Sequence, residues 1–235
     1  MTTVSLVFSC EHGGADVPAR YSGLFESAVG RRALASHRGW DVGAADLAAA
    51  LADAFGAPLI VQRTTRLLVE CNRSADHPQL WSEFSRNLAP VERDRILAEH
   101  WDPHRDAVSK AVASRPRGGV VHVGVHSFTP FWKGRVRTTE IGLLYDPDRV
   151  VEGRLAAAWQ AHLQGQQESA ALVIHRNRPY RGWTDGLITT LRGEMSESRY
   201  VGIELEVSQA LMPASRTLIG ALVASLRDAL DSLER

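Results

Sequence analysis

The sequence has few cysteines and no excess of charge of either sign, and each shortage narrows the classes of protein it can belong to. Cys10 and Cys71 are its only cysteines, which predicts two buried thiols in a reducing compartment. The 27 basic and 27 acidic side chains balance, which argues against nucleic acid or an anionic membrane as the main partner. No apolar run approaches the roughly 20 residues of a membrane span, and the N-terminus lacks the basic region of a signal peptide. These absences predict a cytoplasmic protein.

Lysine is also scarce, since it stands only at positions 110 and 133 and the other cations are arginines. Arginine binds carboxylates through paired hydrogen bonds, although genomic base composition explains the bias equally well. A chain of 235 residues can bury roughly 70–75% of its unfolded surface without disulfides. We therefore expect one domain, residues 1–235.

Strand-like and helix-like segments alternate along the chain. Strands are predicted at 4–9, 57–61, 67–71, 120–126, 140–145, 170–174 and 200–207. Helices are predicted at 42–55, at 91–113 with a break at Pro103, at 148–164, from a cap at Thr184 or Asp185 to Glu194, and from Pro213 to the C-terminus. This alternation predicts an α/β fold with a central mixed, mainly parallel sheet and helices on both faces.

Two of the predicted strands deliver a histidine to one edge of the sheet. The run Cys10-Glu11-His12-Gly13 follows the first strand, and His126 ends the strand at 120–126. Open α/β sheets bind ligands at the carboxyl ends of their strands, and catalytic zinc takes three ligands from His, Asp and Glu. His12 and His126 are therefore candidate metal ligands. The simpler interpretation is two unrelated polar residues at strand ends.

The sequence offers two candidates for the third ligand, Asp41 and Glu11. Asp41 stands just before helix 42–55, where capping the helix is the simpler role. Glu11 is adjacent to His12, and neighbouring strand residues point to opposite faces. We therefore expect Glu11 to face away from the ion or to lie behind its ligands.

Two carboxylates interrupt the last predicted strand. Glu204 and Glu206 alternate with apolar residues and so share one face of that strand. Charged groups are rarely buried without a partner or a role, and a hydrolytic metal site needs a base that takes a proton from water. The alternative is an amphipathic edge strand whose charged face is wet.

Arg66, Asn72 and Arg73 flank the predicted strand at 67–71. An arginine beside an asparagine can clamp a carboxylate, since the guanidinium binds it through two hydrogen bonds and the amide adds a donor. The alternative is the ordinary surface of an arginine-rich protein. Glu70 is placed to neutralise one of these arginines.

Six motifs in order resemble the N-formylglutamate amidohydrolase family over about residues 4 to 215. The motifs are Ser9-Cys10-Glu11-His12-Gly13-Gly14, Gly39-Trp40-Asp41-Val42-Gly43-Ala44, Arg66-Leu67-Leu68-Val69-Glu70-Cys71-Asn72-Arg73, His122-Val123-Gly124-Val125-His126-Ser127-Phe128, Asn177-Arg178-Pro179-Tyr180 and Gly202-Ile203-Glu204-Leu205-Glu206-Val207. That family looks distantly similar to zinc carboxypeptidases and aminoacylase-like amidohydrolases, which implies a zinc-carboxypeptidase-like sheet. It also implies hydrolysis of the amide bond of an N-formyl or N-acyl amino acid, such as N-formylglutamate.

The resemblance implies roles for particular residues of this chain. A Zn²⁺ cofactor is held by His12, Asp41 and His126; Glu204 is the catalytic base; Arg66 or Tyr180 stabilises the oxyanion; and Asn72 and Arg73 bind the carboxylate of a small-molecule substrate. Asp41 departs from the carboxypeptidase pattern, in which the carboxylate ligand follows the first histidine within a few residues. Register with the family's last strand selects Glu204 over Glu206.

Two other functions remain open from the sequence. A cysteine hydrolase would use Cys10 as nucleophile with His12 and Glu11 as base and orienting group, although residues so close on one strand do not easily reach that geometry. A non-catalytic module would bind acidic metabolites through the same arginines without a metal. The oligomeric state is not predicted.

Overall fold

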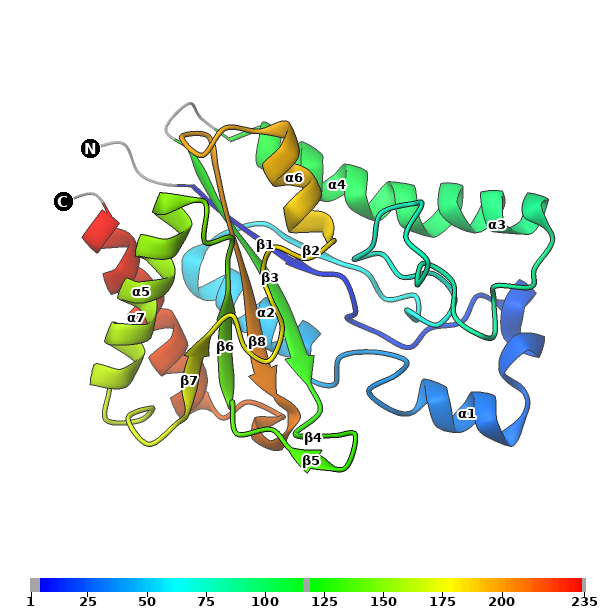
Figure 1. The fold of residues 1–235 in the computed structure, drawn as a ribbon, viewed down its shortest axis with the longest axis horizontal. Helices are drawn as coiled ribbons and strands as arrows, with labels where there is room; N and C mark the ends of the chain where they lie inside the picture. Colours follow the sequence, from blue (N-terminus) through cyan, green and yellow to red (C-terminus); the bar gives the residue numbers. More distant parts are fainter. Residues whose placement is uncertain (1–4, 116–118, 234–235) are drawn as a thin grey trace.

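The buried apolar segments form a six-stranded sheet in the computed structural model, which describes residues 5–115 and 119–233 (Figure 1). The strands lie in the order β2 (Leu59–Val61), β1 (Ser5–Cys10), β3 (Val120–Phe128), β8 (Tyr200–Ser208), β6 (Ile141–Leu144) and β7 (Ile174–Arg176). Only the pairing of β6 with β8 is antiparallel among these strands, so the predicted mixed, mainly parallel sheet is confirmed. Val4, predicted to begin the first strand, lies outside the described residues.

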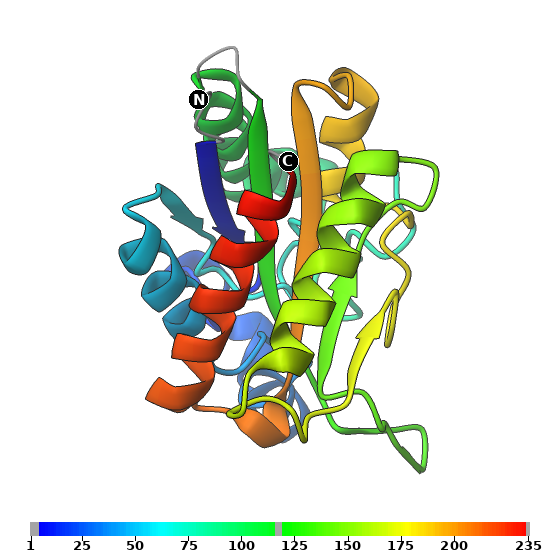
Figure 2. The same ribbon diagram turned by 90° about the vertical axis from the view of Figure 1, so that its left-hand side faces the viewer.

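Side-chain alternation gives the sheet two different faces. On one face, apolar residues such as Phe8, Val123 and Ile203 pack against α2 (Ala44–Phe55), α5 (Val150–Gly165) and α7 (Arg216–Leu233). Figure 2 shows α5 and α7 side by side across this face. The opposite face is covered only in part, by α4 (Asp102–Ala113) and α6 (Leu187–Glu194), which pack around Val7 and Tyr200. Helices therefore cover both faces, as predicted.

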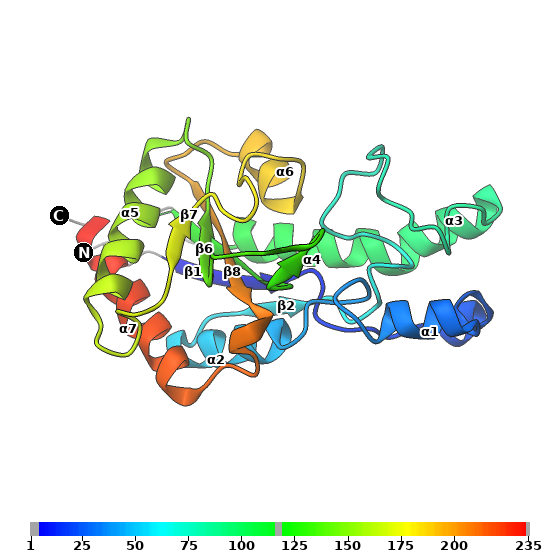
Figure 3. The same ribbon diagram turned by 60° about the horizontal axis from the view of Figure 1, so that its bottom comes forward.

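The rest of the second face carries polar side chains. Residues such as His126, Glu204 and Glu206 lie where β3 and β8 run parallel toward the same edge. The remaining elements are η1 (Ala19–Phe25), α1 (Ala28–Leu34), α3 (Pro90–Ile96), η2 (Leu97–Trp101), the hairpin of β4 (Phe131–Trp132) with β5 (Arg135–Val136), and η3 (Gln209–Leu211). Figure 3 shows α1 and α3 beyond the end of the sheet, with the loops between β2 and α3 beside them. A site at this edge is thus bounded by loops from several parts of the chain.

The predicted strand at 67–71 is wrong. These residues form turns, and Leu68, Val69 and Cys71 are buried in a small separate core with Leu80 and Ile96. A short apolar run indicates burial, but periodicity alone does not distinguish a buried strand from buried turns. The consequence is functional, because the turns direct Arg66 and Glu70 into the edge of the sheet instead of along it.

Two other predicted elements are shifted, and the break predicted near Pro103 is confirmed. The strand predicted at 170–174 starts only at Ile174, because turns follow the end of α5. A π-helical turn, Leu97–Trp101, separates α3 from α4 just before Pro103, whose missing N–H and ring exclude a regular helix there. Helix α2 begins after Gly43, which has a φ of 78°, so Asp41 does not cap it with its side chain.

In the described parts of the chain, no helix is both long enough and apolar enough to cross a membrane.

Candidate active site

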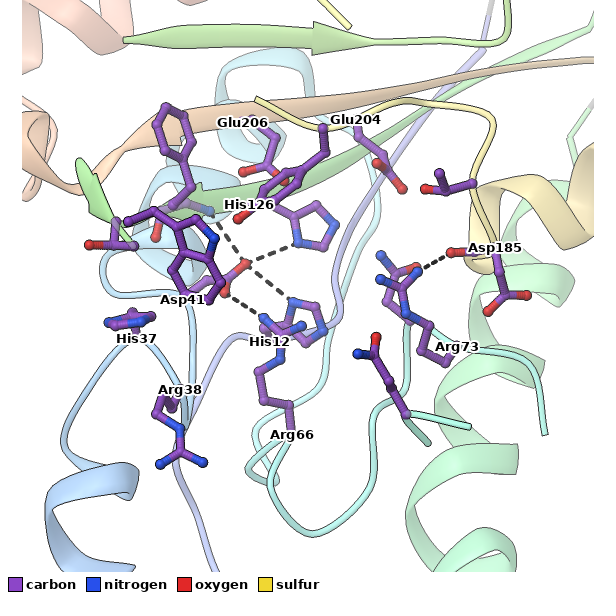
Figure 4. Close-up of a pocket in the computed structure, with 18 of the residues that line it drawn as sticks. His12, His37, Arg38, Asp41, Arg66, Arg73, His126, Asp185, Glu204 and Glu206 are labelled. Atoms are coloured by element: carbon purple, nitrogen blue, oxygen red, sulfur yellow. Dashed lines mark hydrogen bonds and ion pairs between the residues drawn. The ribbon is translucent and has the colours of Figure 1, made fainter. Parts of the chain in front are cut away.

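The eight residues singled out in the sequence line one cleft at the carboxyl edge of the sheet (Figure 4). They are His12, Asp41, Arg66, Asn72, Arg73, His126, Tyr180 and Glu204. They come from the ends of β1, β3 and β8 and from three loops, so the fold gathers residues that are far apart in the sequence. Glu206 lines the same cleft.

Asp41 joins the two candidate histidine ligands. Its Oδ2 lies 3.2 Å from His12 Nδ1 and 3.0 Å from His126 Nδ1, and all three side chains are buried. One ligand atom from each residue lies within 4.8 Å of the others. Ligand atoms of a tetrahedral zinc site, with bonds of about 2.0–2.2 Å, lie about 3.3 Å apart. The spacing and the two-histidine, one-carboxylate donor set therefore fit a zinc ion.

The far side of each histidine ring also faces a carboxylate. His12 Nε2 contacts Glu70 Oε1, and His126 Nε2 lies 3.1 Å from Glu11 Oε2. Histidines that bind metals usually hold their second nitrogen against such a group, which fixes the ring orientation. Both rings are thus oriented with Nδ1 toward Asp41, as a metal site at that point requires.

Charges in this cluster compensate one another. Burial alone would raise the pKa of Asp41, but the neighbouring His12, His126 and Arg66 hold it well below its usual value. Arg66 donates to Glu70 Oε2 at 2.7 Å, and its Nη1 lies 3.3 Å from Asp41 Oδ1. The expectation that Glu70 neutralises an arginine is therefore confirmed, and the same carboxylate also supports His12.

Glu11 does not line the cleft. This agrees with the expectation that neighbouring residues of a strand, such as Glu11 and His12, point to opposite faces. Glu11 is 3% exposed and lies between His126 and His104, whose Nε2 is 3.5 Å from Glu11 Oε1. The position of Glu11 behind His126 agrees with one of the two expectations from the sequence, whereas the position of Glu70 behind His12 was not predicted. The sequence did contain one indication of these positions: each glutamate stands at the end of an apolar run, and a carboxylate is costly to bury there without a partner.

Arg73 lies on the other side of the cleft from His37 (Figure 4), and Asn72, its neighbour in the chain, also lines the cleft. Arg73 donates to the backbone carbonyl of Asp185, and no carboxylate among the described residues forms an ion pair with it. Its charge therefore remains available to a bound anion.

The N-terminus of α6 is not capped by Thr184 or Asp185, the two residues predicted to cap it. Instead, Asn72 Oδ1 accepts the backbone N–H of Leu187 at 2.8 Å, and Asp185 binds Ser74 through both carboxylate oxygens. Asn72 is therefore a structural link to α6, and its amide nitrogen remains as the donor for a ligand. A cap from a residue more than a hundred positions away leaves no local signal.

Tyr180 is 44% exposed at the mouth of the cleft. Its hydroxyl accepts a hydrogen bond from Arg137 Nη1 at 3.0 Å, and the Arg137 guanidinium lies 5.0 Å from the centre of its ring. Arg137 thereby ties the loop that carries Tyr180 to the β4–β5 hairpin.

Cys10 lies outside the cleft. Its side chain is fully buried among the apolar residues under α2, on the face of the sheet opposite the polar edge. Burial raises the pKa of this thiol well above its usual value, so it stays protonated and is a poor nucleophile. The geometry disfavours the cysteine hydrolase.

Comparison with known proteins agrees with the motif pattern. The family model described as N-formylglutamate amidohydrolase matches residues 4–212. The crystal structure of a gene product from Agrobacterium tumefaciens is 33% identical with a TM-score of 0.83, and the match covers 99% of this chain and 92% of that one. An N-formylglutamate amidohydrolase from Ralstonia eutropha is 18% identical with a TM-score of 0.71, covering 98% and 93%.

A weaker likeness is to a metallo-carboxypeptidase from Burkholderia cenocepacia, with 12% identity, a TM-score of 0.40, and coverage of 99% of this chain and 57% of that one. No curated protein matches the sequence. The family match extends over nearly the whole chain, and it includes every residue of the cleft named above. The chain belongs to the N-formylglutamate amidohydrolase family and is an amidohydrolase.

Proposed function

We propose that this protein is a zinc-dependent hydrolase that cleaves the amide bond of an N-formyl or N-acyl amino acid, such as N-formylglutamate. The observation that carries the proposal is Asp41 Oδ2, which lies within hydrogen-bond distance of Nδ1 of both His12 and His126. The two free, buried thiols support a cytoplasmic location.

A zinc ion held by these three residues would polarise the amide carbonyl and lower the pKa of a water to about 7. Glu204 takes the proton from the attacking water and delivers it to the leaving nitrogen. Arg66 or Tyr180 donates a hydrogen bond to the developing oxyanion. Arg73 and the amide of Asn72 bind the α-carboxylate of the substrate.

The direct test is to strip the purified protein of metal and then restore zinc. We expect hydrolysis of N-formyl-L-glutamate to fall to background without metal and to return with one equivalent of zinc. A protein that binds acidic metabolites without turnover, or that hydrolyses them equally well without metal, would contradict the proposal.

Replacing Arg73 with alanine is expected to raise KM for N-formyl-L-glutamate about 10- to 100-fold, with a smaller change in kcat. The loss of a charge-assisted hydrogen bond costs about 1.5–3 kcal/mol, and Arg73 forms no ion pair within the described chain. The matched control is a substrate whose α-carboxylate is replaced by an uncharged amide. Equal losses on both substrates would show that Arg73 does not bind the carboxylate.

Replacing Glu11 with glutamine is expected to weaken zinc binding about 10- to 100-fold, because the carboxylate that orients His126 is lost. Competition with a chromophoric chelator measures this affinity without reference to activity. Glu99→Gln changes an exposed glutamate and serves as the control. Unchanged zinc affinity in the Glu11 variant would remove Glu11 from the support of the site.

A further inference from the structure

The cleft continues past the His12–Asp41–His126 cluster on the side away from Arg73. Figure 4 shows His37 and Arg38 on one side of the cluster and Arg73 and Asp185 on the other. The whole cleft has a volume of about 760 Å³. A formyl group adds only a hydrogen to the scissile carbonyl, so the acyl part of an N-formyl substrate makes almost no contact beyond that carbonyl.

The His37 end is walled by aromatic side chains. His37 and Trp132 meet edge to face, with ring centres 6.0 Å apart and an interplanar angle of 77°. Phe128 also lines the cleft and is 2% exposed. Trp132, in contrast, is 45% exposed, on a hairpin of only two residues per strand. A ligand that covers the Trp132 ring would remove apolar surface from water, which favours binding.

Arg137 holds this wall in place from behind. Its guanidinium lies 5.3 Å from the ring centre of Trp132 and 5.5 Å from that of Phe128, and it also donates to the Tyr180 hydroxyl. A guanidinium at such distances is attracted to the face of an aromatic ring. Arg137 therefore links the Trp132 ring on the hairpin to Phe128 and to the loop that carries Tyr180.

This end of the cleft offers little free charge. Arg38 forms an ion pair with Glu83, and Arg137 does not line the cleft. Burial, and then the nearby Arg38 and Arg137, lower the pKa of His37, so its ring is neutral at neutral pH. The neutral His37 ring and the aromatic rings beside it therefore suit a flat, apolar group.

We propose that His37, Phe128 and Trp132 form an acyl-binding subsite for substrates with a flat apolar acyl group larger than formyl. The proposal rests on the proposed function. In an N-acyl amino acid, the acyl substituent and the α-carboxylate project to opposite sides of the scissile carbonyl. With the carboxylate at Arg73 and the carbonyl at the His12–Asp41–His126 cluster, the acyl substituent points toward Trp132.

The test compares kcat/KM of the zinc-loaded enzyme for the N-formyl, N-acetyl and N-benzoyl forms of L-glutamate. The wild type is expected to hydrolyse the N-benzoyl form at least as well as the N-formyl form. Trp132→Ala is expected to lower the benzoyl-to-formyl ratio about tenfold, the range expected for a small apolar contact, and Trp132→Phe to retain most of it. Phe131→Ala is the matched control, because Phe131 is 57% exposed on the same hairpin and does not line the cleft.

Different outcomes separate the subsite from the function on which it rests. Hydrolysis of the N-formyl form alone would overturn the subsite and leave the proposed function standing. An equal fall in all three values in Trp132→Ala would likewise overturn it, since Trp132 would then act only through the fold. Failure of the zinc-loaded wild type on all three compounds would overturn the proposed function itself.

Discussion

Glu204→Gln is expected to lower kcat about 10²- to 10⁴-fold while leaving the zinc content and the KM nearly unchanged. A positioned general base contributes about this factor, and glutamine keeps the shape of the side chain without its basicity. Stopped-flow or steady-state hydrolysis of N-formyl-L-glutamate, together with metal analysis of the same preparation, measures both quantities.

The surroundings of Glu204 support this role. Two glycines lie beside the side chain: a Cβ at Gly124 would lie 3.7 Å from Glu204 Cγ, and a Cβ at Gly186 would lie 3.6 Å from Glu204 Oε1, both at ordinary contact distance. Glu204 is partly exposed in the cleft, where Figure 4 shows its carboxylate on the side toward Arg73 and Asp185. The carboxylate is therefore accessible from the cleft.

Glu206→Gln is the matched comparison, because it makes the same change two residues along the same strand. Glu206 is paired in register with His126 and is 6% exposed. Burial, together with the carboxylates of Asp41 and Glu204, raises the pKa of Glu206 to about 8, so this group holds a proton at neutral pH. A cation beside it would lower that value. We expect a loss of less than about tenfold in kcat, well below the effect of a lost general base.

The two variants also test the assignment against its rival. If Glu206→Gln abolishes turnover and Glu204→Gln does not, the base is Glu206. If both variants lose zinc, both carboxylates support the metal site. The fall in kcat would then not measure proton transfer by Glu204 or Glu206, and the assignment of Glu204 as base would be withdrawn.

Asp41→Ala is expected to lower zinc affinity more than about 100-fold, beyond the effect expected for a residue that only orients a ligand. Activity at limiting zinc should fall at least about 10³-fold, since the metal contributes several kcal/mol to catalysis. The change also removes one of two carboxylates that contact Arg66, so circular dichroism should establish that the variant is folded. Zinc affinity equal to that of the wild type would exclude Asp41 as a ligand.

Cys10→Ala provides the control for the alternative chemistry. Cys10 is in the core on the other face of the sheet, so this variant should retain zinc and turnover, with some loss of stability. Loss of turnover in a folded, zinc-loaded Cys10→Ala protein would revive the cysteine hydrolase and contradict the metal mechanism.

The main strands were predictable because their signals are local. The strands around Val7, Val123 and Ile203 combine β-branched residues with burial on both faces, and a parallel connection through helices places their carboxyl ends at one edge. Edge and loop segments were less predictable. Residues 67–71 are as apolar as a strand, yet they pack under loops, where tertiary contacts and not periodicity decide the backbone.

The sequence by itself determined the mainly parallel sheet and eight of the residues that line the cleft. Only the tertiary structure decided their contacts: Asp41 lies between two histidines instead of capping α2, Asn72 caps α6, and Glu11 lies behind His126. The physical reason is the range of the interactions. Strand and helix periods are set by neighbours along the chain, whereas buried carboxylates take whichever distant partner the assembled fold brings within reach.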